Sequence, residues 1–301
     1  MKKSASIAMI ATAAVLWAMI GLYTNVFGKM GYTNMQIIFL RSAATVIFMG
    51  IFLLIKDKKL FTVKLKDMWI FIGMGFLSFC MFNFLYFSAI KLNNSLSMAC
   101  ILMYTAPIFV MLFSAVLFKE KITAKKITAL FLTLLGCIFV SGGNTSMTPL
   151  GLAAGLATGL GYSLYSIFGT YAINKKYSTY TATFYAFLFS MIGSFFMCDA
   201  PGAVKMCIAK LNNIFLFLSF GIVNTALPYM LYTKGLEKIE ASKAVIICCI
   251  EPVVATIFSV VIFKQHFGFL SFLGMISIFA AIAMLNIKIK IGAFNKQNVN
   301  I

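Results

Sequence analysis

The sequence predicts an all-α integral membrane protein, with ten transmembrane helices arranged as two inverted five-helix repeats. Three observations predict this fold: the composition, the distribution of lysines between apolar segments, and a repeat at half the chain length. Of the 301 residues, 62% are hydrophobic and 11% are charged, and the mean hydropathy is +0.99. A soluble protein keeps roughly a quarter of its residues charged, because its surface faces water. Lipid is therefore the solvent for most of this chain.

Ten apolar segments are long enough to cross a bilayer, which takes about 20 residues of helix. The connections between them are short and contain Lys, Asn, Gly and Pro, as turns do. The first segment exceeds the apolar region of a signal peptide, so we expect it to be retained as a helix. The segments lie near residues 5–27, 34–55, 68–90, 95–118, 124–141, 149–171, 179–198, 212–233, 241–263 and 268–287.

The lysines predict the orientation of these segments. Nineteen of the 25 basic residues are lysines at the N-terminus, in every second connection and in the C-terminal tail, whereas the intervening connections carry five. The remaining basic residue, Arg41, lies inside the second segment. Because cytoplasmic loops are enriched in lysine, this bias predicts that both termini are cytoplasmic. With no targeting segment evident in the sequence, we expect the protein in the cytoplasmic membrane. A count that was wrong by one segment would destroy the alternation.

The net charge of +18 does not predict nucleic-acid binding, because the lysines form short clusters between apolar segments, where they would face lipid headgroups. The seven cysteines form no CxxC pair, and with the single His266 they give no plausible zinc site. Cys198 and Cys207, which flank one connection, are expected to stay unpaired. We therefore expect neither a metal nor a cofactor.

Residues 84–143 and 229–285 resemble each other at half the chain length. This similarity predicts two units, 1–145 and 146–301, each with five helices. Because five is odd, the second unit must enter the membrane from the opposite side, as in many secondary transporters. The matched positions, at an offset of 145, are Pro107 with Pro252, Phe118-Lys119 with Phe263-Lys264, and Glu120 with Gln265.

Short motifs in a fixed order make the chain resemble the drug/metabolite transporter superfamily, and within it the EamA type with two five-helix units. The resemblance spans nearly the whole chain, and it implies transport of a small molecule without specifying the cargo. The family pattern often has Glu-Pro in both repeats, so Ala106-Pro107 here argues against a symmetric role for two carboxylates. The motifs are Leu16-Trp17-Ala18, Phe39-Leu40-Arg41, Tyr104-Thr105-Ala106-Pro107, Leu117-Phe118-Lys119-Glu120, Glu251-Pro252, Gly136 and Gly142.

Glu251 is the strongest candidate for a functional residue, because it is the one acidic residue well inside an apolar segment. A carboxylate at bilayer depth costs about 2.5–3.5 kcal/mol, so it must be neutral, paired or next to water. Pro252 follows it and removes a backbone donor, which can bend the helix. Two interpretations stay open: a protonatable or solute-facing group on the transport path, and a structural carboxylate.

Other polar and aromatic residues at membrane depth are candidates for solute contact or for packing between helices. Arg41 pairs with helix carbonyls, pairs with an anionic cargo or extends to a membrane interface, and the structural interpretation is favoured. Asn83 and Tyr86 share a helix face, since they are three residues apart. Uncompensated amides are costly in lipid, so Asn83 and Asn224 should face the protein interior or a cavity. The full set is Trp17, Asn83, Tyr86, Tyr104, Tyr162, Tyr165, Asn224, Tyr229 and Glu251 for solute binding, with Arg41, Pro107, Pro228 and Pro252 as structural or gating residues.

Gly151, Gly155 and Gly159 recur every four residues in the sixth segment. This pattern of small residues lets helix backbones approach closely in a membrane. We therefore expect this segment to pack tightly against a neighbouring helix.

The sequence favours a secondary transporter that works by alternating access through a cavity between the repeats. No nucleotide-binding P-loop is present. The resemblance points to export of amino acids or related amphipathic compounds, with import or exchange of nucleotide or sugar derivatives as the alternative. Proton coupling through Glu251 and facilitated exchange both stay open, as do a monomer and a homodimer. A channel is disfavoured, because the sequence indicates neither rings of like residues nor a pore loop. An enzyme is disfavoured, because one histidine and one buried carboxylate make a poor catalytic set.

Overall fold

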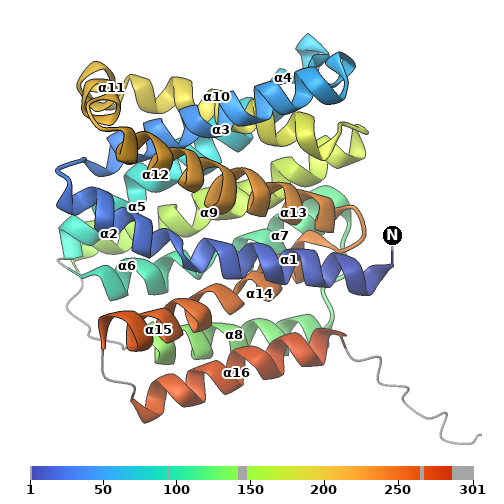
Figure 1. The fold of residues 1–301 in the computed structure, drawn as a ribbon. Helices are drawn as coiled ribbons and strands as arrows, with labels where there is room; N and C mark the ends of the chain where they lie inside the picture. The colour runs from blue at the N-terminus through green and yellow to red at the C-terminus, as the bar shows by residue number, and fades with distance from the viewer. Residues whose placement is uncertain (1, 94, 142–147, 265–267, 287–301) are drawn as a thin grey trace, which may run out of the picture.

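The computed structural model describes residues 2–93, 95–141, 148–264 and 268–286, and the described chain is helical with short connections. The long helices lie roughly parallel to one another (Figure 1). The elements of the first half are α1 (Lys3–Ala18), α2 (Ile20–Lys29), α3 (Asn34–Lys56), η1 (Lys58–Phe61), η2 (Leu65–Asp67), α4 (Met68–Ile72), η3 (Gly73–Met81), α5 (Phe82–Asn93), α6 (Leu96–Met103), α7 (Ala106–Phe118) and α8 (Ala124–Ser141).

The second half contains the same kinds of element. They are α9 (Pro149–Asn174), α10 (Thr179–Phe195), α11 (Ala200–Ile208), α12 (Leu211–Gly221), η4 (Ile222–Ala226), α13 (Leu227–Leu236), α14 (Ala241–Cys248), α15 (Ile250–Phe263) and α16 (Phe269–Asn286). The predicted boundary at residue 145 falls outside the described residues.

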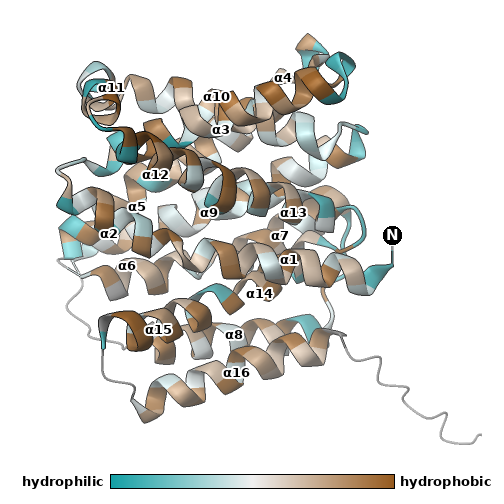
Figure 2. Ribbon diagram, viewed as in Figure 1, coloured by the Kyte–Doolittle hydropathy of each residue, from teal (hydrophilic) through white to brown (hydrophobic). Residues whose placement is uncertain are grey.

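The outer surface is apolar. Large aliphatic side chains are highly exposed, for example Ile55 at 82% and Val116 at 79%, and hydrophobic residues run along the helices while hydrophilic ones gather near helix ends (Figure 2). Such a surface is stable in lipid, not in water. Within the described residues, seven helical stretches are long and apolar enough to cross a membrane, or eight if the bent pair α10–α11 is counted as one span. Helix α16 is apolar but shorter, and ten crossings remain a prediction.

The internal repeat is visible as two helices broken at equivalent positions. The predicted segment 95–118 is split into α6 and α7, and the predicted segment 241–263 is split into α14 and α15. Each second half begins just before a proline, Pro107 or Pro252, whose missing N–H makes it compatible with the first turn of a helix but not with the interior.

The two broken helices also end alike. Lys119 and Lys264 follow α7 and α15 in the left-handed conformation, with φ of 56° and 55°. Their N–H groups donate to the carbonyls of Ser114 and Ser259, and both pairs are related by the offset of 145 seen in the sequence.

Two further predicted helices contain π-helical segments at matching places. In the first half, η3 interrupts the segment predicted at 68–90, and in the second half, η4 interrupts the segment predicted at 212–233. Such insertions disturb the regular hydrogen-bond ladder and are frequent at functional sites. The first predicted segment also has a local break, at Met19, yet all three stretches are still long and apolar enough to be single spans.

The connection after the predicted segment 179–198 is also a helix. Helix α11 follows α10 at an angle of 109°, and the Asp199 carboxylate accepts the Gly202 N–H at 3.0 Å to cap it. Cys198 and Cys207 are free thiols in this structure.

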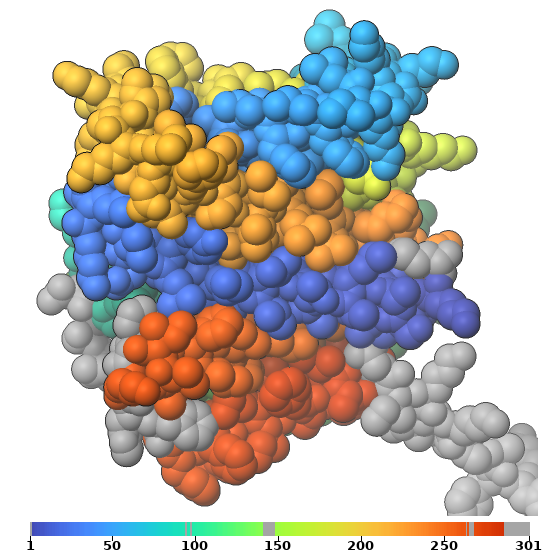
Figure 3. Space-filling view, viewed as in Figure 1, coloured from blue at the N-terminus to red at the C-terminus, as the bar shows by residue number. Residues whose placement is uncertain are grey.

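Helix α1 from the first half lies among helices of the second half. It contacts α13, α14 and α15, and the space-filling view shows α1 filling the space between the α12–α13 layer and the α14–α15 layer (Figure 3). The two halves are therefore interleaved around a shared core.

The glycine stripe of α9 packs as predicted. A Cβ on Gly155 would lie 2.2 Å from Leu102 Cδ1, and one on Gly159 would lie 2.9 Å from the Leu102 carbonyl oxygen. Glycine is required here because the backbone of α9 lies directly against α6 and the break that follows it. Close helix packing thus surrounds the broken segment in the first half.

Candidate solute site

A small enclosed cavity lies where the two halves meet. It offers about 20 Å³, which is space for little more than one water molecule. In this arrangement of the helices the cavity has no room for a metabolite. The residues that line it are Trp17, Ser78, Phe82, Tyr162, Tyr165, Ser166, Tyr229, Tyr232, Val245 and Cys248.

Breaks in helices bring several of these residues together. Trp17 is in the last turn of α1, just before the break at Met19, and Cys248 is the last residue of α14. Tyr229 follows η4 near the start of α13. Because helix ends carry backbone groups without intrahelical partners, breaks at membrane depth place polar groups beside the cavity.

Aromatic rings form most of the wall. Tyr229 is central: its ring centroid lies 4.9 Å from that of Trp17 and 4.8 Å from that of Tyr165, both at steep angles. Edge-to-face geometry of this kind is favourable and rigid. The indole nitrogen of Trp17 is buried and has no hydrogen-bond partner in the described structure. Trp17 therefore brings an unpaired donor to the group of residues that line the cavity.

The tyrosine hydroxyl groups are held by short polar contacts. The Tyr232 hydroxyl and Ser166 Oγ are 2.6 Å apart, and the Tyr165 hydroxyl and Thr233 Oγ1 are 3.2 Å apart. These contacts join α9 to α13 across the cavity wall, so they fix the rings in place.

Glu251 lies beside the cavity at the start of α15, directly after the break at Cys249. The Tyr162 hydroxyl donates to Glu251 Oε2 at 3.4 Å. Within the described residues no cation pairs with this carboxylate. Tyr86 and Tyr104 are within electrostatic range of it, so the surroundings of Glu251 are polar hydroxyl groups and packed apolar side chains, not countercharges.

Arg41 is enclosed, with 4% exposure. Its Nε donates to Thr225 Oγ1 at 3.1 Å, and its guanidinium lies 4.9 Å and 4.7 Å from the ring centroids of Phe79 and Phe220. Cation–π contacts compensate part of the charge. The alternative in which Arg41 extends to a membrane interface is therefore wrong for this structure. Its role as a structural or gating group remains a prediction.

The remaining predicted residues are distributed around the cavity. Asn224 donates from Nδ2 to the Leu16 carbonyl at 2.5 Å, next to the break in the first helix. Asn83 donates from Nδ2 to the Phe79 carbonyl, four residues earlier in the same helical stretch, at 2.7 Å. The Tyr86 hydroxyl is 3.0 Å from Cys100 Sγ. None of these three lines the cavity.

The prolines lie at the starts of helices. Pro107, Pro228 and Pro252 are each buried in the first turn of α7, α13 and α15. They mark the ends of the interruptions that give the cavity its polar lining.

Six lining residues were missed by sequence reasoning: Ser78, Phe82, Ser166, Tyr232, Val245 and Cys248. Two of them carried a usable signal. Tyr232 is three residues after Tyr229, and Ser166 is four residues after Tyr162, so each shares a helix face with a predicted residue. In the described part of the chain no group of three metal-ligating side chains occurs.

Comparison with known proteins shows which family has this architecture. The model of the EamA-like transporter family matches residues 4–142 and again residues 149–287. The chain belongs to the EamA-like transporter family. It therefore contains two EamA units and is a multi-pass membrane protein that acts on a small-molecule substrate, and the family is one of transporters, not enzymes.

Similar proteins agree with this assignment. The EamA-like chain is 23% identical over 292 residues to the uncharacterized transporter YxxF of Bacillus subtilis (strain 168), covering 94% of this chain and 90% of the relative. It is 30% identical over 183 residues to an uncharacterized transporter of Archaeoglobus fulgidus, covering 60% of this chain and 64% of that relative's length. A crystal structure superimposes with a TM-score of 0.76 at 17% identity, over 95% of this chain and 97% of the other, which shows a shared fold.

Proposed function

We propose that this EamA-like protein is a secondary transporter that moves a small metabolite by alternating access through the cavity between its two units. In this proposal ten helices cross the membrane, the second unit is inverted relative to the first, and both termini are cytoplasmic. The observation that carries the proposal is the aromatic cavity, since Trp17 and Phe82 come from one unit and Tyr162 and Tyr232 come from the other. A site shared by both units changes its access when the units rock against each other.

The lining suggests an amphipathic solute. Stacked and edge-on rings suit a flat or apolar part, while the unpaired Trp17 indole N–H and the nearby Glu251 carboxylate suit a polar or cationic part. Amino acids and related amines combine these properties, and export is the direction that the resemblance favours. Nucleotide or sugar derivatives are the alternative cargo.

Counterflow into liposomes tests the proposal. Purified protein is reconstituted, loaded with one unlabelled solute at high concentration, and supplied with the same labelled solute outside, across a panel of amino acids, amines and sugar derivatives. We expect accumulation of one chemical class. If protein that elutes as a single folded species gives no counterflow for any class, the proposed function is wrong.

Glu251→Gln at two pH values tests the role of the carboxylate. Gln keeps the size and the hydrogen bond from Tyr162 but cannot take up a proton. If Glu251 couples protons, transport depends on pH in the wild type and loses that dependence in the variant. Unchanged pH dependence would leave the carrier in place and assign Glu251 to structure.

A further inference from the structure

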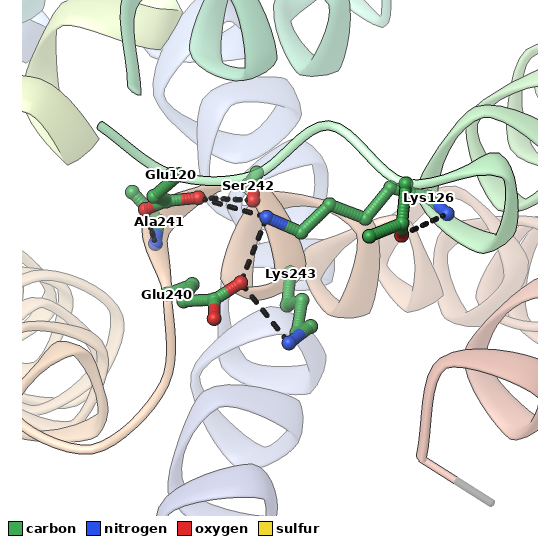
Figure 4. A network of polar contacts seen from close by, with 7 residues as sticks. Glu120, Lys126, Glu240, Ala241, Ser242 and Lys243 are labelled. Atoms are coloured by element: carbon green, nitrogen blue, oxygen red, sulfur yellow. Dashed lines mark hydrogen bonds and ion pairs between the residues drawn. The ribbon is translucent and has the colours of Figure 1, made fainter. Parts of the chain in front are cut away.

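We propose that Glu120, Lys126, Glu240 and Lys243 form an ionic latch that closes the cavity at one end of the protein, and that this end opens only when the latch separates. The inference rests on the proposed alternating access. The latch lies at the end of the helix bundle where α1 begins, which is called the N-terminal face below. Figure 4 shows the four side chains converging from two loops and two helices.

The latch joins the two EamA units directly. Lys126, from the start of α8 in the first unit, donates to Glu120 at 3.2 Å and to Glu240 of the second unit at 2.7 Å. Lys243 pairs with the same Glu240 carboxylate at 3.0 Å. The side chains of Lys126 and Glu120 are only 4% and 10% exposed. A charge pair that is enclosed in this way is strongly coupled, because removing one partner leaves the other buried and uncompensated.

Glu120 also caps the helix that leads to the cavity. Its Oε1 accepts the N–H of Ala241, the first residue of α14, and its Oε2 accepts the hydroxyl of Ser242. A carboxylate is stabilised at this position, because the first N–H groups of a helix have no intrahelical partners and carry partial positive charge. Thus a residue of the first unit holds the N-terminus of a helix of the second.

Helix α14 connects the latch to the solute site. It begins at Ala241 and ends at Cys248, which lines the cavity, and this distance is about 10 Å along the helix axis. The break at Cys249 and the Glu251 carboxylate follow at once. Movement of the α14 N-terminus away from Glu120 would therefore move a wall of the cavity.

The internal repeat does not conserve the charges of the latch at its four equivalent positions. Inverted repeats bring equivalent positions to opposite faces, and the offset of 145 identifies them in the sequence. All four charged residues of the latch correspond to uncharged ones. The pairs are Glu120 with Gln265, Lys126 with Ser271, Glu240 with Ser95, and Lys243 with Met98.

The hydrogen bonds of Ser95, the counterpart of Glu240, differ from those of Glu240. Ser95 caps its own helix α6, accepting the N–H of Met98 at 3.2 Å, whereas Glu240 at the start of α14 makes ion pairs. Gln265 lies outside the described residues. The repeat therefore makes the two ends alike in backbone but unequal in charge, so the N-terminal face is the more firmly closed of the two.

The reporter for the test is Cys248, which is 3% exposed and lines the cavity. The other six cysteines are replaced, and the protein is reconstituted in vesicles whose orientation is known from an N-terminal tag. A membrane-impermeant maleimide is then added from the N-terminal face, and the rate of Cys248 labelling is measured. This measurement needs no substrate.

Glu120→Gln removes the negative charge of Glu120 from the latch. It should raise the rate of Cys248 labelling at least about tenfold, the shift that corresponds to roughly 1.4 kcal/mol in a two-state equilibrium. Glu240→Gln, at a more exposed position, should raise the labelling rate less. It replaces Glu120→Gln as the test variant if Glu120→Gln does not fold. The matched control is Glu237→Gln. Glu237 pairs with Lys234 within one unit, with both side chains partly exposed, so its loss should change the rate by less than about twofold.

The outcomes separate the latch from the proposed function. Faster labelling in Glu120→Gln and Glu240→Gln but not in Glu237→Gln supports the latch, even if no solute shows counterflow. Equal labelling in all folded variants overturns it, even if counterflow is observed. Faster labelling from the opposite face alone would also overturn it.

Discussion

Replacing Gly75 with Ala should destabilise the protein, because this glycine allows η3 to lie directly against α10. A Cβ at this position would be 2.1 Å from the Ala186 carbonyl oxygen and 2.9 Å from the Ser190 backbone nitrogen. These are backbone atoms, so no side-chain rotation relieves the overlap and one helix must move.

The expected magnitude is the difference between two opposing effects. Overpacking a tightly packed site costs about 1–3 kcal/mol, and Gly75 lies at the upper end because backbone atoms are involved. Alanine is intrinsically better than glycine in a helix by about 1 kcal/mol. The net loss in the free energy of unfolding should be about 2 kcal/mol.

Gly50→Ala is the matched control, since Gly50 in α3 faces the same partner helix. Its Cβ would meet Phe184 Cε2 at 3.6 Å, an ordinary contact, so this variant should be as stable as the wild type or up to about 1 kcal/mol more stable. Both variants are unfolded reversibly in mixed micelles with increasing SDS, followed by tryptophan fluorescence. If Gly75→Ala is as stable as Gly50→Ala, the reasoning from the close approach is refuted.

Three more predictions concern other contacts. Gly274→Ala should weaken the packing of α16 on α8, because its Cβ would lie 2.6 Å from the Gly136 carbonyl oxygen; the SDS midpoint should fall, and an unchanged midpoint contradicts the contact. Arg41→Lys should lower the free energy of unfolding in the same SDS titration by about 1–2 kcal/mol, since an ammonium cannot stack between two rings as a guanidinium does; a neutral result would show that the stacking contributes nothing. Burial raises the pKa of Glu240, but its two lysine partners lower it more, so the net direction is downward from 4.5. Its stabilisation is therefore present at neutral pH and lost as the pH falls below 4.5, and the stability gap between wild type and Glu240→Gln should close over that range; a constant gap would contradict the ion pairs.

Much of the fold could be predicted from the sequence, because burial in lipid imposes long apolar segments and the lysines mark their connections. The repeat at an offset of 145 was also readable, since Pro107 and Pro252 mark equivalent helix starts. The interruptions were not fully predictable. A proline signals a break, but nothing in Gly73–Met81 or around Met19 distinguishes a π-helical segment or a break from a regular helix, because tertiary packing decides these.

Only part of the candidate site could be predicted from the sequence, because tertiary packing also decides which side chains reach the cavity. Trp17, Tyr162, Tyr165 and Tyr229 line the cavity as aromatic residues at membrane depth, while Asn83 does not, since its amide bonds its own helix. Which face of a helix looks inward depends on neighbours far away in the chain. For the same reason, no pattern in the sequence indicates that Glu120 reaches Ala241, 121 residues away.

The position of α1 among helices of the second unit has a consequence for biosynthesis. Leu16 accepts a hydrogen bond from Asn224, 208 residues further along the chain, so α1 leaves the ribosome long before its neighbours α13, α14 and α15 exist. Until then its buried face, with Ile10, Ala13 and Ala14 at 0% exposure in the finished protein, is covered by lipid or by insertion factors. The two EamA units are thus assembled late and together, and a chain that stops after the first unit would lack the partners of its own first helix.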